Sequence, residues 1–380
     1  MNAPTSYLTS KPHYEILDGL RGVAALLVVL FHFFEAHASR PAEQLINHGY
    51  LAVDFFFVLS GFVIGYAYDD RWHKMTLGNF FKRRLIRLHP MVIMGMFIGT
   101  VFYFFGSEAM FPGMSQVSVW KLLFVFIVGC TLLPLPPSMD IRGWGEMHAL
   151  NGPAWSLFFE YIANILYALI IRKFTKTLLL ILVIVSGGLL IYYAVTSPGG
   201  YLAGGWKLDA TQMRVGFTRL MYPFFGGLLL SRLNFILHIK HAFSICSLLL
   251  VVILAFPRLG GTEHLWLNGL YEALCVILLF PLIVSLGAGS SLSTGKSVHI
   301  CRFLGSISYP LYITHYPVIY LYWNWVTPRR LSLSEVLPVT LLMVLFCIFL
   351  AYACLKLYDE PVRQWLQKRF LTKTVKQEPS

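Results

Sequence analysis

RGVAALLVVLFH, from Arg21 to His32, carries two polar side chains at the ends of a small and apolar segment. Eleven positions are about 20° more than three full turns of an α-helix, so both side chains lie on one face, roughly 16 Å apart along the axis. Arginine binds anions through a rigid fork of donors, and histidine exchanges protons near neutral pH. The stretch therefore predicts a membrane helix with an anion clamp at one end and a proton acceptor towards the other. A snorkelling arginine and a simply hydrogen-bonded histidine remain the alternative.

The composition around this stretch is that of a membrane protein. Of 380 residues, 57% are hydrophobic and only 13% are charged, against about 25% charged residues in a soluble domain. We expect an all-α, polytopic transmembrane bundle forming one domain over residues 1–380, with its core at about 13–365. The ten expected spans are 20–38, 50–68, 91–105, 153–171, 177–196, 213–231, 242–256, 267–287, 307–326 and 335–357. A further apolar piece, 119–133, is ambiguous.

The charge pattern sets the expected topology. The net charge is +12, and cations of membrane proteins collect in cytoplasmic loops. Treating 119–133 as re-entrant or peripheral puts both termini, the loop 69–90 and the basic tail 359–380 in the cytoplasm. If the piece spanned instead, every later loop would invert. The charge needs no nucleic acid to explain it, and no basic and aromatic strip of that kind is present.

Several kinds of site receive no support from the sequence. The six cysteines are scattered without a CxxC pair, and no HExxH, GxSxG, Walker or Rossmann signature appears. We therefore expect neither a metal site nor a nucleotide cofactor. The polar N-terminus lacks the layout of a cleaved signal peptide, so the first span is expected to be retained.

Two further stretches place polar groups beside the first helix. VDFFFVLSGF (53–62) holds Asp54, which needs a partner within an apolar span, and a Ser-Gly pair that permits close helix packing. FKRRLIRLHP (81–90) clusters Arg83, Arg84 and Arg87 before Pro90, which we expect to introduce the third span. Arg84 and Arg87 share a helical face. Positive-inside bias explains cations here, but their compactness favours phosphate binding.

Two later stretches hold polar and aromatic groups within apolar segments. NGPAWSLFFE (151–160) carries Trp155, Ser156 and Glu160. LGSISYPLYITHYP (304–317) carries a second group, namely Tyr309, Tyr312 and His315. An intramembrane carboxylate or histidine is by default a hypothesis of function, although packing or anchoring at the interface explains the aromatic residues equally well.

Together, these motifs resemble the acyltransferase-3 family of integral membrane acyltransferases, which O-acylate carbohydrates. The resemblance extends over about residues 13–365 and rests on Arg21 and His32, FFVLSGF, the Arg-x-x-Arg pair, WSL before Glu160, and SYPLYITHYP. It implies a cytoplasmic acyl-CoA donor, usually acetyl-CoA, and a glycan or lipid-linked saccharide acceptor outside the membrane. It also implies the bacterial inner membrane, essential roles for Arg21, His32, Arg84 and Arg87, and a glycan-assembly or acyl-relay protein as a potential partner.

The resulting hypothesis gives each candidate residue a role. Arg21, Arg84 and Arg87, with Arg83, hold the donor's phosphates, and His32 deprotonates the acceptor hydroxyl. Glu160 or Asp54 orients the histidine. The substrate-contacting group is Trp155, Ser156, Tyr309 and His315. An acyl-histidine intermediate is the less favoured route. Two other functions remain open: a transporter or flippase with an intramembrane proton relay, and a scaffold for glycan assembly.

Overall fold

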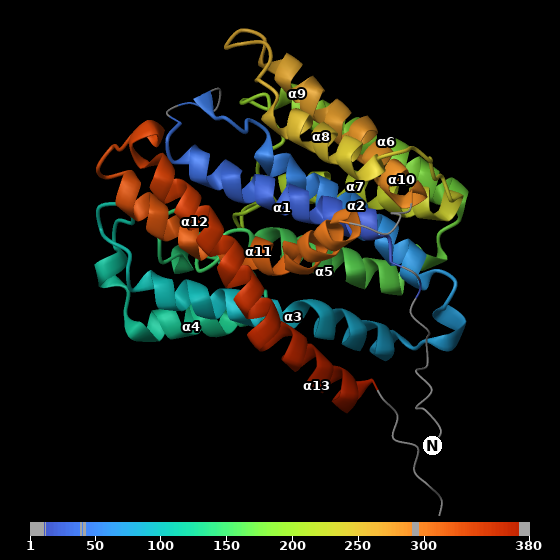
Figure 1. Ribbon diagram of the computed structural model, residues 1–380, viewed down its shortest axis with the longest axis horizontal. Coiled ribbons are helices and arrows are strands. Elements are labelled where there is room, and N and C mark those ends of the chain that lie inside the picture. The colour runs from blue at the N-terminus through green and yellow to red at the C-terminus, as the bar shows by residue number, and fades with distance from the viewer. Residues whose placement is uncertain (1–10, 12, 39, 41–42, 291–295, 372–380) are drawn as a thin grey trace, which may run out of the picture.

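The computed structural model describes residues 11, 13–38, 40, 43–290 and 296–371, and within them it contains helices and no strands (Figure 1). Most of the polar N-terminal segment, and Lys373 and Lys376 of the expected basic tail, lie outside these residues. The helices are α1 (Glu15–Glu35), α2 (Ala52–Tyr68), α3 (Leu77–Tyr103), α4 (Val119–Cys130), α5 (Ala154–Leu169), α6 (Lys176–Thr196), α7 (Ala210–Leu233), α8 (Ala242–Ala255), α9 (Leu265–Leu274), α10 (Phe280–Gly289), α11 (Lys296–Val326), α12 (Leu333–Cys354) and α13 (Glu360–Phe370).

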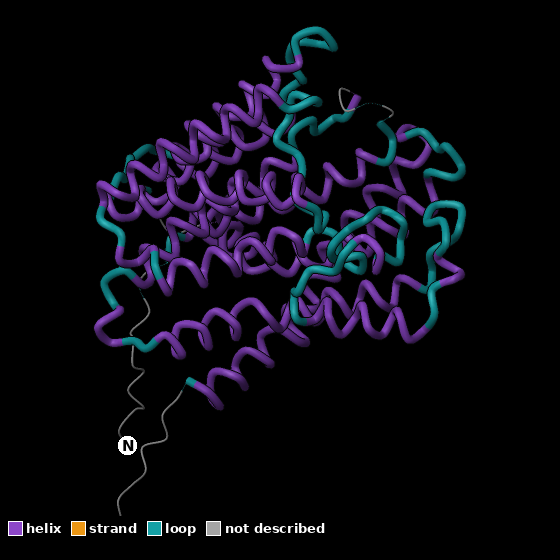
Figure 2. Tube along the Cα trace, turned by 180° about the vertical axis from the view of Figure 1, so that it is seen from behind, coloured by secondary structure: helices purple, strands orange, loops and turns teal. Residues whose placement is uncertain are grey.

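Two helix pairs form the centre of the bundle, namely α1 with α11 and α2 with α7. Glycines set their close approach. A Cβ atom on Gly22 of α1 would lie 2.5 Å from the carbonyl oxygen of Leu304, and one on Gly61 of α2 would lie 2.1 Å from that of Phe224. The packing role expected for the Ser-Gly pair is thus confirmed for Gly61. Most helices run side by side along one direction in the view from behind (Figure 2).

The described helices agree with the expected membrane segments. A helix lies in each of the ten predicted ranges. Six helical stretches are long and apolar enough to cross a bilayer: Glu15–Glu35, Gly49–Tyr68, Leu77–Tyr103, Lys176–Thr196, Leu265–Gly289 and Leu333–Phe370. The chain therefore has the helices of an integral membrane protein, while the full count of ten spans stays a prediction.

One predicted boundary is wrong. The third span does not begin after Pro90; α3 starts at Leu77, with Thr76 accepting a hydrogen bond from the Asn79 amide, and carries Pro90 inside it. Membrane helices tolerate an internal proline because neighbouring groups satisfy the freed backbone atoms. The basic tail after Asp359, for which no secondary structure was predicted, begins as helix α13, which packs against α3. Helices α3 and α13 therefore carry cations that were expected in a loop and in the tail.

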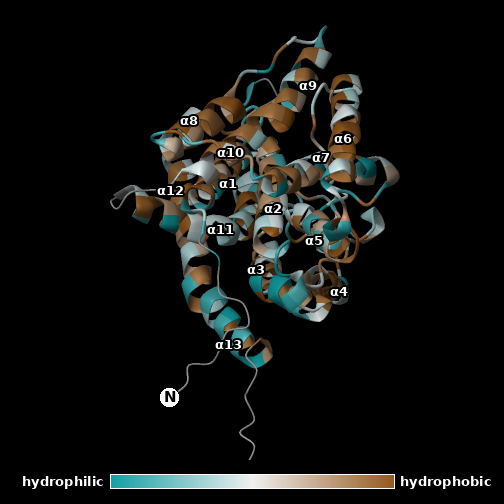
Figure 3. Ribbon diagram, turned by 90° about the vertical axis from the view of Figure 1, so that its right-hand side faces the viewer, coloured by the Kyte–Doolittle hydropathy of each residue, from teal (hydrophilic) through white to brown (hydrophobic). Residues whose placement is uncertain are grey.

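The surface of the bundle is apolar where helices face outward. Figure 3 shows hydrophobic residues along α6, α8 and α9, whereas α13 carries mostly hydrophilic ones. Large exposed apolar side chains include Ile184 on α6 and Leu248 on α8, at 65% and 64% exposure. Such a belt is expected of helices that contact lipid, because lipid tails are as apolar as these side chains, which therefore need not be buried against other helices.

Candidate active site

The Arg21–His32 face of α1 borders two neighbouring cavities. Arg21 lines one of about 240 Å³, and His32 lines the other of about 340 Å³. Val53 of α2 and Tyr312 of α11 line both, so they form part of the partition between them. We call these spaces the arginine cavity and the histidine cavity. The helical spacing read from the sequence therefore separates the two polar groups into adjoining chambers.

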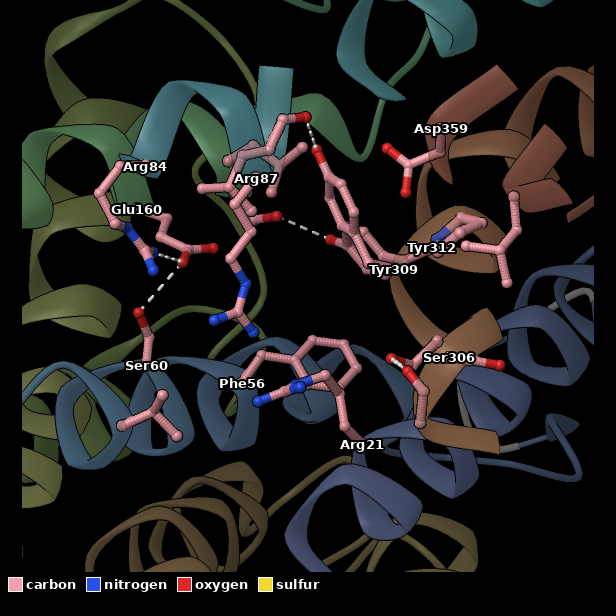
Figure 4. Close-up of a pocket in the computed structure, with 18 of the residues that line it drawn as sticks. Arg21, Phe56, Ser60, Arg84, Arg87, Glu160, Ser306, Tyr309, Tyr312 and Asp359 are labelled. Carbon is pink, nitrogen blue, oxygen red and sulfur yellow. Dashed lines mark hydrogen bonds and ion pairs between the residues drawn. The ribbon is translucent and has the colours of Figure 1, made fainter. Parts of the chain in front are cut away.

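The arginine cavity gathers cations from three helices. Arg21 comes from α1, Arg84 and Arg87 from α3, and Arg363 from α13. The three arginines of α1 and α3 direct their guanidinium groups into this space (Figure 4). Arg363 was not expected here, because the sequence marks it only as a tail cation. Its helix packs against α3, and that tertiary contact brings it to the cavity.

Three of these four cations are paired with carboxylates. Arg21 Nη1 lies 2.9 Å from Asp18 Oδ1, and Arg363 Nε lies 3.0 Å from Asp359 Oδ2. Arg84 Nη2 lies 2.9 Å from Glu160 Oε1. Arg87 has no hydrogen bond or ion pair among the described residues, and it is exposed within the cavity. A cation without a partner in a cavity already rich in arginine favours binding of a polyanion.

Glu160 belongs to the arginine cavity. Its Oε1 accepts hydrogen bonds from Arg84 and from Ser60 Oγ, the latter at 3.1 Å (Figure 4). Tyr309 lines the same cavity and donates to the Leu88 carbonyl at 2.5 Å. Glu160 thus neutralises the charge of Arg84, a candidate phosphate ligand. Glu160 does not contact His32.

Asp54 is also engaged away from His32. It forms a two-point ion pair with Arg219 of α7, with Nη2–Oδ2 at 2.6 Å and Nε–Oδ1 at 3.2 Å, and both side chains are buried. Arg219 further donates to the carbonyls of Tyr50 and Gly204, and its guanidinium lies 5.0 Å from the ring centre of Trp155. Asp54 therefore satisfies a buried cation that ties α2 to α7.

The carboxylate beside His32 is Glu35, which the sequence reasoning missed. His32 Nδ1 lies 3.0 Å from Glu35 Oε2, one helical turn further along α1. The other ring nitrogen, Nε2, takes no part in this contact. The ring stacks on His315 at 5.6 Å and meets Tyr316 edge-on at 4.8 Å. The i,i+3 spacing of His32 and Glu35 was the available signal.

The histidine cavity has aromatic walls and acidic groups. Tyrosine and tryptophan side chains lining it are Tyr50, Trp144, Trp155, Tyr201, Trp206, Tyr312, Tyr316 and Trp323. The carboxylates are Glu35 and Glu146. Glu146 lies in the loop between α4 and α5 and accepts a hydrogen bond from Tyr320 at 2.5 Å. Burial raises the pKa of Glu146 to about 7. No periodic pattern marks this loop residue in the sequence.

The remaining predicted residues fall around the partition or beneath the cavities. Ser156 lines the arginine cavity and is 2.8 Å from the Tyr312 hydroxyl, which links α5 to α11. His315 is buried, its Nδ1 lies 2.9 Å from the Tyr312 carbonyl oxygen, and its ring stacks on that of His32. Arg83 lies on α3 but does not line either cavity.

The arrangement defines what chemistry this part of the molecule offers. One chamber is lined by four arginines, a composition suited to negative charge, and the adjoining chamber holds a histidine–carboxylate pair within aromatic walls. A histidine whose Nδ1 is held by a carboxylate presents Nε2 for proton transfer. Such a pair suits activation of a hydroxyl or a water molecule.

Comparisons with known proteins agree with this chemistry. The model of an acyltransferase domain, that of the acyltransferase-3 family, matches residues 14–353. "Protein 2 in picA locus" of Rhizobium radiobacter is 34% identical over 160 residues, covering 40% of this chain and 80% of that protein. The O-acetyltransferase OatA of Staphylococcus aureus is 22% identical over 326 residues, which cover 80% of this chain but only 50% of OatA.

A third relative is the acyltransferase MdmB of Streptomyces mycarofaciens, 28% identical over 170 residues, covering 42% of this chain and 40% of that protein. No solved structure matches the chain. The family match covers both cavities, except for the part of the arginine cavity lined by Leu355, Asp359, Glu360 and Arg363, and it covers nearly the whole helical bundle. The chain therefore belongs to the acyltransferase-3 family of membrane acyltransferases.

Proposed function

We propose that this protein transfers an acyl group, most simply acetyl, from cytoplasmic acyl-CoA to a hydroxyl of a glycan or lipid-linked saccharide at the outer side of the membrane. The observation that carries the proposal is the pair of adjoining cavities, one cationic and one holding His32 and Glu35, with Val53 and Tyr312 in their common wall. The donor and the acceptor enter from opposite sides and react at the partition.

The donor's phosphates bind in the arginine cavity. Arg87 supplies a guanidinium without a protein partner, and Arg21, Arg84 and Arg363 add positive charge around it. Arginine suits phosphate because its planar fork donates two parallel hydrogen bonds. The 11-residue spacing of Arg21 and His32 corresponds to roughly 16 Å along α1. The long arm of coenzyme A covers that distance and brings the thioester to His32.

His32 acts as the general base. Its Nε2 takes the proton from the acceptor hydroxyl, and the hydroxyl oxygen forms a bond to the thioester carbonyl carbon. The carbon–sulfur bond then breaks, and the departing thiolate receives the proton that His32 holds. Glu35 keeps Nδ1 protonated and stabilises the positive charge that the ring carries between the two proton transfers. The groups of Glu35 and His32 therefore act as one unit.

The walls of the histidine cavity suit a saccharide acceptor. Binding sites combine apolar and aromatic surface with a few polar groups that fix orientation. Trp144, Trp155, Trp206 and Trp323 provide the flat apolar faces, and Glu146 provides a hydrogen-bonding group. The name of OatA, an O-acetyltransferase, supports the same class of reaction.

The proposed reaction fixes an orientation in the membrane. Ten spans with both termini cytoplasmic, in a bacterial inner membrane, put Lys82 and Arg83 on the donor side. The 12-residue helix α4 is taken as peripheral, because a spanning α4 would place Arg172 and Lys173 outside, against the preference of cations for the cytoplasmic side. Cysteines placed at Thr76 and Lys176 should be labelled from the cytoplasm and one at Ser138 from outside. Cytoplasmic labelling at Ser138 would contradict this orientation.

Supplying radiolabelled acetyl-CoA to membranes tests the function. The protein should transfer label into a glycan fraction, and His32→Ala should remove that transfer at equal protein abundance. His73→Ala is the matched control, because His73 is an exposed histidine outside both cavities. Flux of a saccharide across vesicles without any acyl transfer would instead identify a transporter or flippase. Normal transfer by His32→Ala would contradict the proposed base.

A further inference from the structure

A third cavity lies between α3 and α5, on the other side of Arg84 from the arginine cavity. It has a volume of about 430 Å³. The wall residues are Phe81, Arg84, Leu85 and Leu88 of α3, and Tyr161, Asn164, Ile165 and Leu169 of α5. We call this space the α3–α5 groove. Its residues recur every three or four positions, so each helix contributes one continuous face.

The walls of the groove are apolar and open to the surroundings. Leu85, Ile165 and Leu169 are 45%, 43% and 46% exposed. Leu85 and Ile165 line the groove from separate helices, and neither lines the histidine or the arginine cavity. A groove between membrane helices with such walls is suited to a hydrocarbon chain. Its apolar surface offers few hydrogen-bond partners to water and is buried favourably against another apolar group.

One end of the groove is surrounded by cations. Lys82 and Arg83 flank the groove residues on α3, and Arg172 and Lys173 follow directly after α5. No carboxylate among the described residues pairs with any of these four side chains. Arg172 packs over the Trp72 ring at 4.3 Å instead. Cations that lack a carboxylate partner attract an anion at the end of the groove.

The wall also contains buried polar atoms without partners. Arg84 is 8% exposed and Asn164 is 4% exposed. Arg84 Nε and Asn164 Oδ1 are buried and make no hydrogen bond among the described residues. Native proteins rarely leave such atoms unsatisfied without a ligand or ordered water. Since both residues line the groove, a ligand oxygen there can accept a hydrogen bond from Arg84 Nε, and a hydroxyl group or a water molecule can donate one to Asn164 Oδ1.

We propose that the α3–α5 groove binds an anionic phospholipid of the cytoplasmic leaflet. One acyl chain lies between Leu85 and Ile165, and the phosphate lies among the rim cations at Lys82 and Arg83. A free phosphate fits the rim but leaves the apolar groove empty, and a neutral lipid fits the groove but makes no use of the rim. This site does not depend on acyl transfer; it shares with the proposed function only the cytoplasmic placement of the rim.

Lipid retention by the purified full-length protein tests this site. The probes are phosphatidylglycerol, phosphatidylcholine with the same chains, and inorganic phosphate, each added to protein in an uncharged detergent. Native mass spectrometry counts retained lipid, and thermal melting measures stabilisation. The protein should retain phosphatidylglycerol in preference to phosphatidylcholine, and the double variant K82Q/R83Q should reduce that preference by about tenfold or more. Inorganic phosphate should not stabilise it.

Two further variants separate the groove from general electrostatics. K368Q/R369Q removes the same charge from exposed positions on α13 and should leave the preference intact. Ile165→Trp fills the groove without changing charge and should reduce retention of both lipids, whereas Leu248→Trp on the outer face of α8 should not. Equal retention of the two lipids by the unmodified protein, or equal losses in the two charge variants, would overturn the proposal. Stabilisation by inorganic phosphate equal to that by phosphatidylglycerol would also overturn it.

Discussion

Replacing Glu35 by glutamine removes one negative charge from the carboxylate that meets His32, at a 3.0 Å contact. A glutamine oxygen still accepts a hydrogen bond from Nδ1, so the ring keeps its orientation and only the charge is lost. Glu35 is 36% exposed at its side chain, so solvent screens part of this interaction. A hydrogen bond to a charged group is worth about 1.5–3 kcal/mol and a neutral one about 0.5–1.5 kcal/mol, so losing the charge alone costs about 1–1.5 kcal/mol. That cost corresponds to a fall in kcat of about 5- to 13-fold.

The assay is acetyl transfer by proteoliposomes, with kcat and KM for acetyl-CoA measured separately. Glu35→Gln should lower kcat and leave the KM for acetyl-CoA unchanged, because Glu35 does not line the arginine cavity. Glu35→Ala should lower kcat further, since it also removes the acceptor that orients the ring. Glu263→Gln, an exposed loop position, is the control. A kcat within about twofold of the original in a well-folded Glu35→Gln protein would refute the reasoning, because even the lowest expected loss is about fivefold.

Three other predictions follow from the same contacts. Arg87→Gln should raise the KM for acyl-CoA by about 10- to 100-fold with little change in kcat, Arg87→Lys should recover only part of this, and the exposed Lys74→Gln should change neither constant. Asp54→Asn leaves Arg219 as an unpaired buried cation and should destabilise the protein by about 3–5 kcal/mol, which thermal melting in detergent measures; an unchanged melting temperature would exclude a structural ion pair. Because the pKa of Glu146 is raised to about 7, the folded state holds its proton more tightly than the unfolded state, so stability falls as pH rises from about 4.5 to 7. Glu146→Gln should remove that part of the pH dependence of the melting temperature, and identical profiles would contradict the burial argument.

The relation of residues within one helix was predictable from the sequence. The spacing of Arg21 and His32 sets their common face whatever surrounds them, because helical periodicity is local. The same holds for Arg84 and Arg87, although the boundary of their helix was misplaced by treating Pro90 as a start. The shared face then accounts for the way each pair meets the cavities.

Partners on different helices were not predictable in this way. Asp54 and Arg219 are separated by 165 positions in the sequence, and nothing in either local pattern specifies their contact. Glu160 lies in an apolar segment, which correctly indicates a need for a partner, but the pattern does not distinguish Arg84 from His32 as that partner. Tertiary packing decides such pairings, and it also brings Arg363 to the arginine cavity.

The family resemblance supplied what local patterns lacked. The match over residues 14–353 confirms the acyltransferase-3 assignment that the motifs indicated. The family match does not assign the role of each side chain. Glu35 lies beside His32, whereas the two carboxylates expected there, Glu160 and Asp54, pair with Arg84 and Arg219. Function on this fold therefore has to be argued from contacts within the cavities.

Acetyl transfer by matched proteoliposomes of the unmodified protein, His32→Ala and His73→Ala tests the central claim most directly. The protein amounts are equalised by folded fraction, and label moves from acetyl-CoA on the cytoplasmic face to the acceptor fraction identified in native membranes. We predict that His32→Ala loses about 100- to 10,000-fold in rate, the contribution of a general base, while it still binds acetyl-CoA and His73→Ala keeps full activity. Transfer by folded His32→Ala at a rate close to that of His73→Ala would contradict the account.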